Sequence, residues 1–224
     1  RENHAVGETA MERVAVFLLA AVPVISLVAV VLLCCGSFTA QRALVIGIPI
    51  AIWLSWPLLL SKSDSESRWP PRARGWLVLL LLVAALLRWP PALHLESTSD
   101  QAVYLAMAAH FVENGTLDVT DDVRDSLASP DAVARFDRNN ITGVYQPGIY
   151  VDLEKPGHYV FQFYHVHPLW MAIFGGVLGL NQAVSSQIFF GLISLFFAAL
   201  IAERLSSDWR IGVAFAALLA CLPL

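Results

Sequence analysis

Apolar runs, separated by short polar stretches, make up most of this chain, and one long polar segment interrupts them. A helix of about 20 apolar residues crosses the hydrocarbon core of a bilayer. The runs that reach or approach this length are Val14–Cys35, Ala43–Leu60, Gly75–Leu87, Gln187–Ile201 with Ala202, and a run from Ile211 that is cut off at Leu224. We therefore expect an all-α multispanning membrane protein with about five transmembrane helices, truncated at its C-terminus.

The short loop between the second and third runs sets the expected orientation. Basic residues in short loops mark the cytoplasmic side of a membrane, and this loop carries Lys62, Arg68, Arg72 and Arg74. With the loop inside, the N-terminus is cytoplasmic, the third span runs outward, and the polar segment 94–167 is extracytoplasmic. A solvated linker without topological meaning is the alternative interpretation.

The polar segment opens with a predicted amphipathic helix. From Asp100 onward, apolar residues recur at helical spacing, at Val103, Met107, Phe111 and Val112. A serine or threonine at positions 97–99 would cap the first turn, and Gly115 would end the helix. A second short helix is expected around Pro130–Phe136.

Two Pro-Gly pairs mark turns later in the same segment. They are Pro147-Gly148 and Pro156-Gly157, and the stretches Ile149–Val151 and Tyr159–Phe161 flank them. β-branched and aromatic residues bounded by Pro-Gly turns are typical of short strands. We therefore expect a small β-hairpin in the extracytoplasmic segment.

The apolar run His167–Leu180 decides the topology of the C-terminal part of the chain. The run is short for a span and contains three glycines. If it crosses the membrane, Arg204 and Arg210 lie outside. If it lies along the outer surface or re-enters, they lie inside, as the positive-inside rule prefers. We favour this second, interfacial arrangement, with a juxtamembrane helix after His167.

Composition supports a membrane protein and narrows its partners. The chain is 57% hydrophobic and only 14% charged, with a net charge of −4, whereas soluble domains are about one quarter charged. A nucleic-acid partner is not expected, because proteins that bind nucleic acids present basic faces. The three cysteines, Cys34, Cys35 and Cys221, lie in apolar runs without disulfide or metal-ligand spacing.

Asp100 is the first candidate for chemistry, because it stands just after the third predicted span. A carboxylate at the membrane surface suits a general base or an electrostatic anchor. The alternative is an ordinary acidic residue in the first turn of a helix, where the helix dipole stabilises it. The residues alone leave both interpretations open.

The stretch Tyr164-His165-Val166-His167-Pro168 is the second candidate. In an extended chain His165 and His167 point to the same side, where they would ligate a metal, bind a phosphate, or act as acid and base. Ordinary surface histidines are the alternative. A divalent metal is left open as a cofactor, although spacing fixes no further ligands.

Two cations complete the candidates. Lys155 lies in the extracytoplasmic segment and would face an anionic lipid headgroup; a solvated charge at a hairpin tip is its alternative role. Arg88, at the outer end of the third span, would either snorkel to the headgroups or pair with a lipid phosphate.

The order of these motifs resembles the GT-C membrane glycosyltransferases, the group of the protein O-mannosyltransferases and aminoarabinose transferases. An outward span leads into Ser99-Asp100-Gln101-Ala102-Val103-Tyr104 on an amphipathic helix. The segment Gln162–Trp170, with its His167-Pro168-Leu169, comes after the long loop, and a later span ends in Ala202–Leu205. The resemblance covers about Leu77–Leu224. It differs from the family pattern in Gln101, where a Glu is usual, and in one missing proline after His167.

The resemblance implies an enzyme that takes a sugar from a polyprenyl-phosphate carrier at the membrane. Asp100 matches the family's catalytic Asp and Tyr104 its following Tyr, while His167 matches the His-Pro element. Lys155 would stand in for the loop lysine that contacts the carrier phosphate. The further donor-phosphate or substrate-binding residues would be Arg88, Tyr104, His165 and His167. Residues 1–74 would then be a two-span extension and residues 75–224 the GT-C-like module.

Two other classes remain open from the sequence. A transporter or permease would also be multispanning, but transporters tend to carry ionisable residues within spans and repeated halves, and neither is evident here. A non-catalytic membrane assembly subunit would keep the fold without the activity, and Gln101 is compatible with it.

Overall fold

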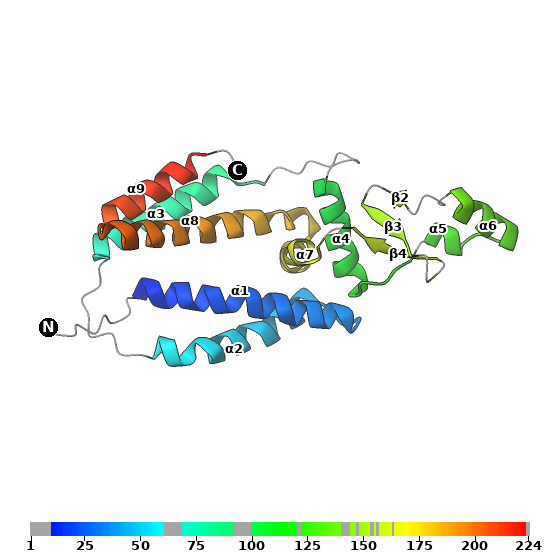
Figure 1. Ribbon diagram of the computed structural model, residues 1–224, viewed down its shortest axis with the longest axis horizontal. Coiled ribbons are helices and arrows are strands. Elements are labelled where there is room, and N and C mark those ends of the chain that lie inside the picture. Colours follow the sequence, from blue (N-terminus) through cyan, green and yellow to red (C-terminus); the bar gives the residue numbers. More distant parts are fainter. Residues whose placement is uncertain are drawn as a thin grey trace. The chain divides into compact units, whose positions relative to one another are not determined.

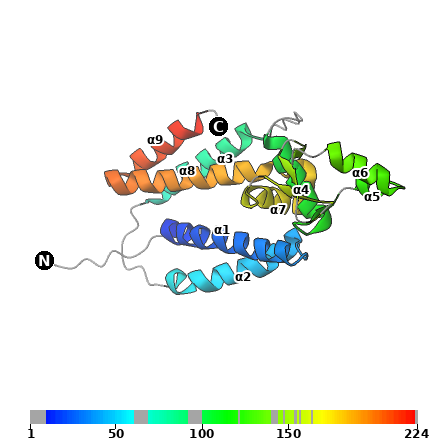
Figure 2. The same ribbon diagram turned by 45° about the vertical axis from the view of Figure 1, so that its right-hand side comes forward.

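The structure is a computed structural model, and it is mostly helical with one small sheet (Figures 1 and 2). It describes residues 10–60, 69–91, 100–120, 122–139, 144–146, 148–152, 155, 157–162 and 164–222. The helices are α1 (Ala10–Cys34), α2 (Ala40–Leu59), α3 (Pro71–Leu87), α4 (Asp100–Asn114), α5 (Asp122–Asp125), α6 (Pro130–Asn139), α7 (Val166–Leu178), α8 (Ser185–Ser206) and α9 (Trp209–Ala220), with a 3-10 turn η1 (Leu180–Gln182). The strands are β1 (Val119–Thr120), β2 (Val144–Gln146), β3 (Ile149–Val151) and β4 (His158–Phe161).

The chain divides into two compact units whose sequences interleave. Unit 1 comprises residues 1–25, 47–91 and 185–224, and unit 2 comprises residues 26–46 and 92–184. The end of α1 and the start of α2 therefore belong with the polar segment rather than with the other long helices. From the sequence, we predicted that a GT-C-like module begins after residue 74. The two compact units do not test this boundary, so it stays a prediction.

Small residues let α2 pack closely on α1. Ala43, Gly47, Ala51 and Ser55 recur every four residues on one face of α2, and all four are buried. A Cβ added at Gly47 would lie 2.9 Å from Cγ1 of Ile25 on α1. Small residues at this spacing are typical of closely packed helices in membranes, and Gly47 is the position at which α2 approaches α1 closely.

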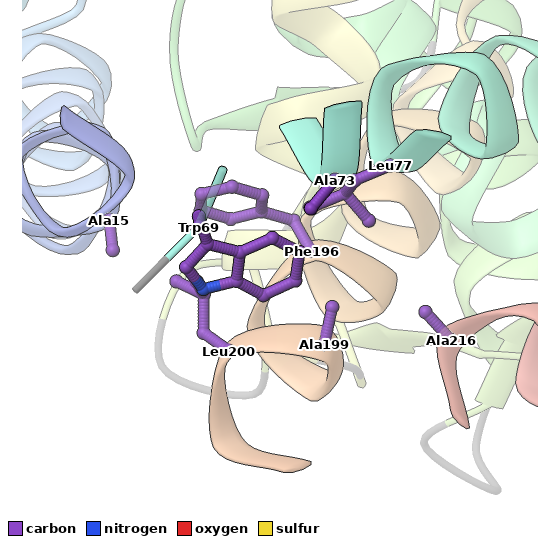
Figure 3. Packing of buried hydrophobic residues seen from close by; sticks show 8 residues of the cluster. All are labelled: Ala15, Trp69, Ala73, Leu77, Phe196, Ala199, Leu200 and Ala216. Carbon is purple, nitrogen blue, oxygen red and sulfur yellow. The ribbon is translucent and has the colours of Figure 1, made fainter. Parts of the chain in front are cut away.

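In unit 1, α3, α8 and α9 lie side by side around a shared apolar core (Figure 1). The ring of Trp69, which precedes α3, lies beside Phe196 of α8 (Figure 3). Gly212 of α9 lets α9 come close, because an added Cβ there would lie 2.6 Å from the Ala199 carbonyl oxygen. The buried cluster consists of Ala15, Trp69, Ala73, Leu77, Phe196, Ala199, Leu200 and Ala216.

Two contacts fix the directions of these helices. The Arg88 guanidinium donates to the carbonyl of Ala84 (3.2 Å) in α3 and to that of Ala220 (2.9 Å) in α9, so α3 and α9 end together and run the same way. Arg204 near the end of α8 pairs with Glu12 near the start of α1. α8 leads through residues 207–208 into α9, which packs along it, so α8 runs opposite to α9 and α3. Figure 1 shows α1 running in the same direction as α3 and α9.

Two of the described helices are long and apolar enough to cross a membrane. They are Ala10–Cys34 and the continuous helical stretch Leu180–Ser206, which contains α8. The helices at the other predicted spans form as well, with bounds within a few residues of those expected. Helical architecture is thus confirmed, and two candidate spans are present among the described residues.

The sheet of unit 2 contains the expected hairpin and adds a strand on each side of it. β3 pairs antiparallel with β4, with Tyr150 opposite Val160, and the strand order is β1-β4-β3-β2. The sequence predicted only the central pair. β1 and β2 have two and three residues, which is too short for an alternating pattern to be visible.

Candidate functional site

The helix that begins with Asp100 is held in place at its far end. Gly115 ends α4 with φ of +66°, a conformation that glycine adopts freely. Its carbonyl accepts a hydrogen bond from the Phe38 N–H (3.1 Å), and an added Cβ would lie 2.8 Å from the Phe38 carbonyl oxygen. The turn between α1 and α2 is therefore attached directly to the end of α4.

The helix that carries the His-Pro element is buried along its middle, while Val166 at its start and Leu178 at its end are exposed. Residues 168–173 and Gly175 of α7 are buried. Trp170 Nε1 donates to Ser26 Oγ of α1 (2.9 Å), and Gln41 Nε2 of α2 donates to the Gly176 carbonyl (3.1 Å). Its 13 residues extend about 20 Å, less than the roughly 30 Å of a hydrocarbon core.

The two motifs that carried the resemblance meet where α4 packs on α7. Tyr104 of α4 and His167 of α7 contact edge to face, with ring centroids 5.1 Å apart and an interplanar angle of 85°. Asp100 lies one helical turn before Tyr104, on the same face of α4. Segments more than 60 residues apart in the sequence are thus joined beside the carboxylate.

A second group of rings lies farther along α4. Phe111 stacks on His165 with centroids 6.1 Å apart, and it meets Phe161 of β4 edge to face at 6.3 Å. His110 also contacts Phe161 (6.0 Å), and its Nδ1 lies 3.0 Å from Asn114 Nδ2. These contacts bring α4, β4 and the start of α7 together.

Burial makes the imidazoles of this region poor bases. It lowers the pKa of His165 and of His167, and it is also the largest influence on His110, whose pKa is lowered although Glu113 and Asp118 nearby favour its protonation. Because the ordinary value is about 6.5, all three are neutral at pH 7. They act there as hydrogen-bonding groups and carry no charge to offset a phosphate.

Asp100 itself is exposed at the first residue of α4, so a substrate can reach its carboxylate from solvent. The expected capping residues 97–99 lie outside the described part of the chain. Among the described residues, no three His, Cys, Asp or Glu side chains are grouped as a metal site requires. What the structure shows for Asp100 is thus a carboxylate at the start of α4 that is open to solvent.

Lys155 stands at the closed end of the β3–β4 hairpin. Three bonds define this turn: the Asp152 N–H to the His158 carbonyl (2.9 Å), the His158 N–H to the Lys155 carbonyl (3.0 Å), and the Lys155 N–H to Asp152 Oδ1 (3.3 Å). Phe161, which contacts α4, lies at the opposite end of β4. The length of β4 therefore separates the Lys155 turn from the contact with α4.

Arg124 supports this turn, although its sequence context did not single it out. Its guanidinium lies over Gly157, where an added Cβ would be 2.6 Å from Nη1. Gly157 has φ of +89°, and the Arg124 side chain is only 15% exposed. Beside the turn, His158 Nδ1 lies 2.5 Å from Asp118 Oδ1. In the sequence, Pro156-Gly157 indicated a turn here, and nothing indicated that Arg124 would pack over it.

Arg88 has a structural role that its sequence position did not reveal. Its bonds to Ala84 and Ala220 satisfy the terminal carbonyls of two helices, and a cation at helix C-termini is favoured by both helix dipoles. It belongs to unit 1, whereas Asp100, Tyr104, Lys155, His165 and His167 belong to unit 2. Arg88 therefore does more than snorkel to the headgroups, because it also joins the ends of two helices.

Comparison with known proteins gives no relative from which a function can be transferred. No family model, curated protein or solved structure matches the chain. Its function must accordingly be inferred from the residues and their geometry.

Proposed function

We propose that this protein is an integral membrane glycosyltransferase that moves a sugar from a polyprenyl-phosphate donor to an extracytoplasmic acceptor, with Asp100 as general base. The observation that carries the proposal is the contact between Tyr104 and His167. It unites the Asp motif with the His-Pro element, the two features on which the resemblance to GT-C enzymes was based.

The proposed reaction is a single displacement at the anomeric carbon. An acceptor hydroxyl attacks that carbon, its oxygen forms the new glycosidic bond, and its proton passes to Asp100. The bond between the anomeric carbon and the phosphate oxygen breaks, and polyprenyl phosphate leaves with the bonding electrons. The exposure of Asp100 supports this role, because the acceptor must arrive from solvent.

The phosphate requires hydrogen-bond donors and positive charge. A neutral His165 supplies an N–H donor rather than charge, as its lowered pKa indicates. From the resemblance, we still predict that Lys155 and Arg88 supply the positive charge beside the phosphate. Arg88 already uses two of its five N–H donors on helix carbonyls, which leaves three for a lipid phosphate.

A five-span arrangement accompanies this function in the proposal. The directions of α1, α3, α8 and α9 support it. A chain that crosses the membrane at α1, α2, α3, α8 and α9 in turn would give α1, α3 and α9 one direction and α8 the opposite one. With the basic loop inside, Arg204 and Arg210 fall on the cytoplasmic side, as the positive-inside rule prefers. α7 is too short to cross, which supports the interfacial topology over the alternative.

The decisive experiment replaces Asp100 by Asn in the complete protein. Its carboxylate would no longer accept a proton, and we expect transfer to fall at least 100-fold, within the range for general bases. Transfer is measured as the radiolabelled mannose, glucose or aminoarabinose that moves from the polyprenyl-phosphate donor to acceptors in native membranes, together with the polyprenyl phosphate released. Asp131→Asn is the matched control, because Asp131 is also an exposed acid in the first turn of a helix.

The outcomes separate the rival classes. Activity lost in Asp100→Asn and kept in Asp131→Asn supports the proposal. Full activity in Asp100→Asn refutes the assigned mechanism. A wild-type protein that releases no polyprenyl phosphate from any donor, but moves a solute across vesicles or binds a membrane partner, supports a transporter or an assembly subunit.

A further inference from the structure

The first turn of α4 depends on α7 for its position. Val103, Met107 and Phe111 are buried, whereas Asp100 at the beginning of the helix is exposed. One turn after Asp100, Tyr104 makes its edge-to-face contact with His167. Such a pair of rings contributes about 0.5–1.5 kcal/mol beyond simple burial, which favours the observed orientation of this helical turn.

The helix that begins beside His167 is held by contacts with both α1 and α2. The residue after it, Pro168, is fully buried, and the helix beyond is bonded to α1 through Trp170 and to α2 through the Gly176 carbonyl. Gly176 also packs against Ala40, since an added Cβ would lie 2.7 Å from the Ala40 Cβ. A continuous set of contacts therefore runs from the α1–α2 pair through α7 to Tyr104.

We propose that His167 is a positioning residue: its ring holds Tyr104, and through Tyr104 it sets the position of the Asp100 carboxylate. This inference rests on the proposed function, because the position of the Asp100 carboxylate affects transfer only if Asp100 is the general base. It changes the role expected for His167 and Tyr104 from contact with the donor to support of the base. Position 167 then requires a flat ring of suitable size, rather than a proton or a hydrogen bond.

The test compares His167→Phe with His167→Ala in the complete protein. The phenylalanine keeps the edge-to-face contact, so kcat, KM and the pH profile stay near wild type. The alanine removes the contact, so kcat falls on the order of 10- to 100-fold, as for a small misplacement of a reacting group, while KM for the donor is unchanged. Tyr164→Ala is the control, because Tyr164 is 93% exposed beside α7.

A double-mutant cycle shows whether His167 acts through Tyr104. Tyr104→Ala is expected to lower kcat as much as His167→Ala, and the double variant is expected to be no worse than either single one, because each breaks the same contact. Independent losses that multiply would overturn the inference. So would a His167→Phe variant as impaired as His167→Ala, which would show that the imidazole itself meets the substrate or a proton.

Hydrogen exchange separates failure of this inference from failure of the proposed function. The amides of residues 104–107 close the first turns of α4, and we expect them to exchange faster in His167→Ala but not in His167→Phe. If Asp100→Asn stays active while exchange shows this pattern, the proposed function fails and the contact stands. If exchange is unchanged in His167→Ala, the positioning role fails by itself.

Discussion

At the scale of residues, the histidines differ most from what a sequence suggests. A His-x-His stretch invites a metal or a charged phosphate site, yet each imidazole here faces an aromatic ring in a half-buried interface. Burial favours the neutral form, because the charged form loses its hydration. The packing of α4 on α7 is therefore linked to the protonation of His110, His165 and His167.

This linkage predicts that acid destabilises unit 2. The folded-state pKa of each of these histidines is lowered, so between that value and the ordinary value of about 6.5 the unfolded state binds more protons. Stability is then fully present above pH 6.5 and is lost as the pH falls through the folded-state values. Denaturant unfolding of purified protein at pH 7.5 and pH 5.5 should show the loss.

The matched variant removes the titrating groups and keeps their polarity. In His165→Gln with His167→Gln, the loss of stability on acidification should shrink, and the remainder should come from His110. An equal loss in this variant and in wild type would show that the imidazoles do not control the acid response. Glu113 and Asp118, which lie near His110 and favour its protonation, oppose the effect at that one residue.

Sequence could single out Asp100 and His167 but not the relation between them. Each was notable for its place beside an apolar run, and their relation depends on a helix packing that spans more than 60 residues. Arg88 was recognised as an interfacial arginine. Its bond to Ala220, 132 positions away, could not be predicted, because nothing in the local pattern indicates which carbonyl a guanidinium will reach. Nothing in the sequence around Arg124 indicated its contact with the turn at Gly157.

At the scale of elements, close approach by small residues holds α1 and α2 together. In the proposed membrane arrangement, lipid would provide no hydrophobic driving force between helices, so association would rely on van der Waals contact over a tight interface. Gly47 allows such close contact with Ile25 of α1. The opposite face of α2 exposes large apolar side chains such as Trp53 and Trp56, as a lipid-facing surface would.

Gly47→Leu should therefore separate the two helices. Its side chain would enter the space that Ile25 occupies, where even a Cβ would lie 3.1 Å from the Ile25 Cα. Overpacking typically costs about 1–3 kcal/mol, which should appear as a lower unfolding midpoint of the protein in detergent. Ile48→Leu, on the exposed side of α2, is the control and should unfold like wild type. Equal midpoints for both variants would contradict the close packing.

Most elements were predictable because their signals are local. Long apolar runs predicted α1, α2, α3, α8 and α9, the helical spacing of apolar residues predicted α4, and the two Pro-Gly turns predicted β3 and β4. The short strands β1 and β2 were missed, since a strand of two or three residues forms only where a neighbour supplies its hydrogen bonds. α5, with four residues, is barely one helical turn and is too short to show a periodic pattern.

At the scale of the whole molecule, the proposed topology, with the basic loop inside, predicts which segments are reached from outside the cell. After the native cysteines are replaced by alanine, Ser129→Cys in the polar segment should react with a membrane-impermeant maleimide in intact cells. Ser207→Cys, between α8 and α9, should react only after permeabilisation. Both positions are exposed, so access depends on the side of the membrane. Labelling of both in intact cells would exclude the proposed topology.

The bond between Phe38 and Gly115 has a consequence for how such a protein can evolve. The first two helices look like an addition in front of a self-sufficient module, as if they had been acquired later. Yet their connecting turn is built into the unit that holds Asp100, and Ser26, Ala40 and Gln41 all support α7. A gene that lost these helices would lose the scaffold of its proposed reaction centre, so the two parts must be inherited together.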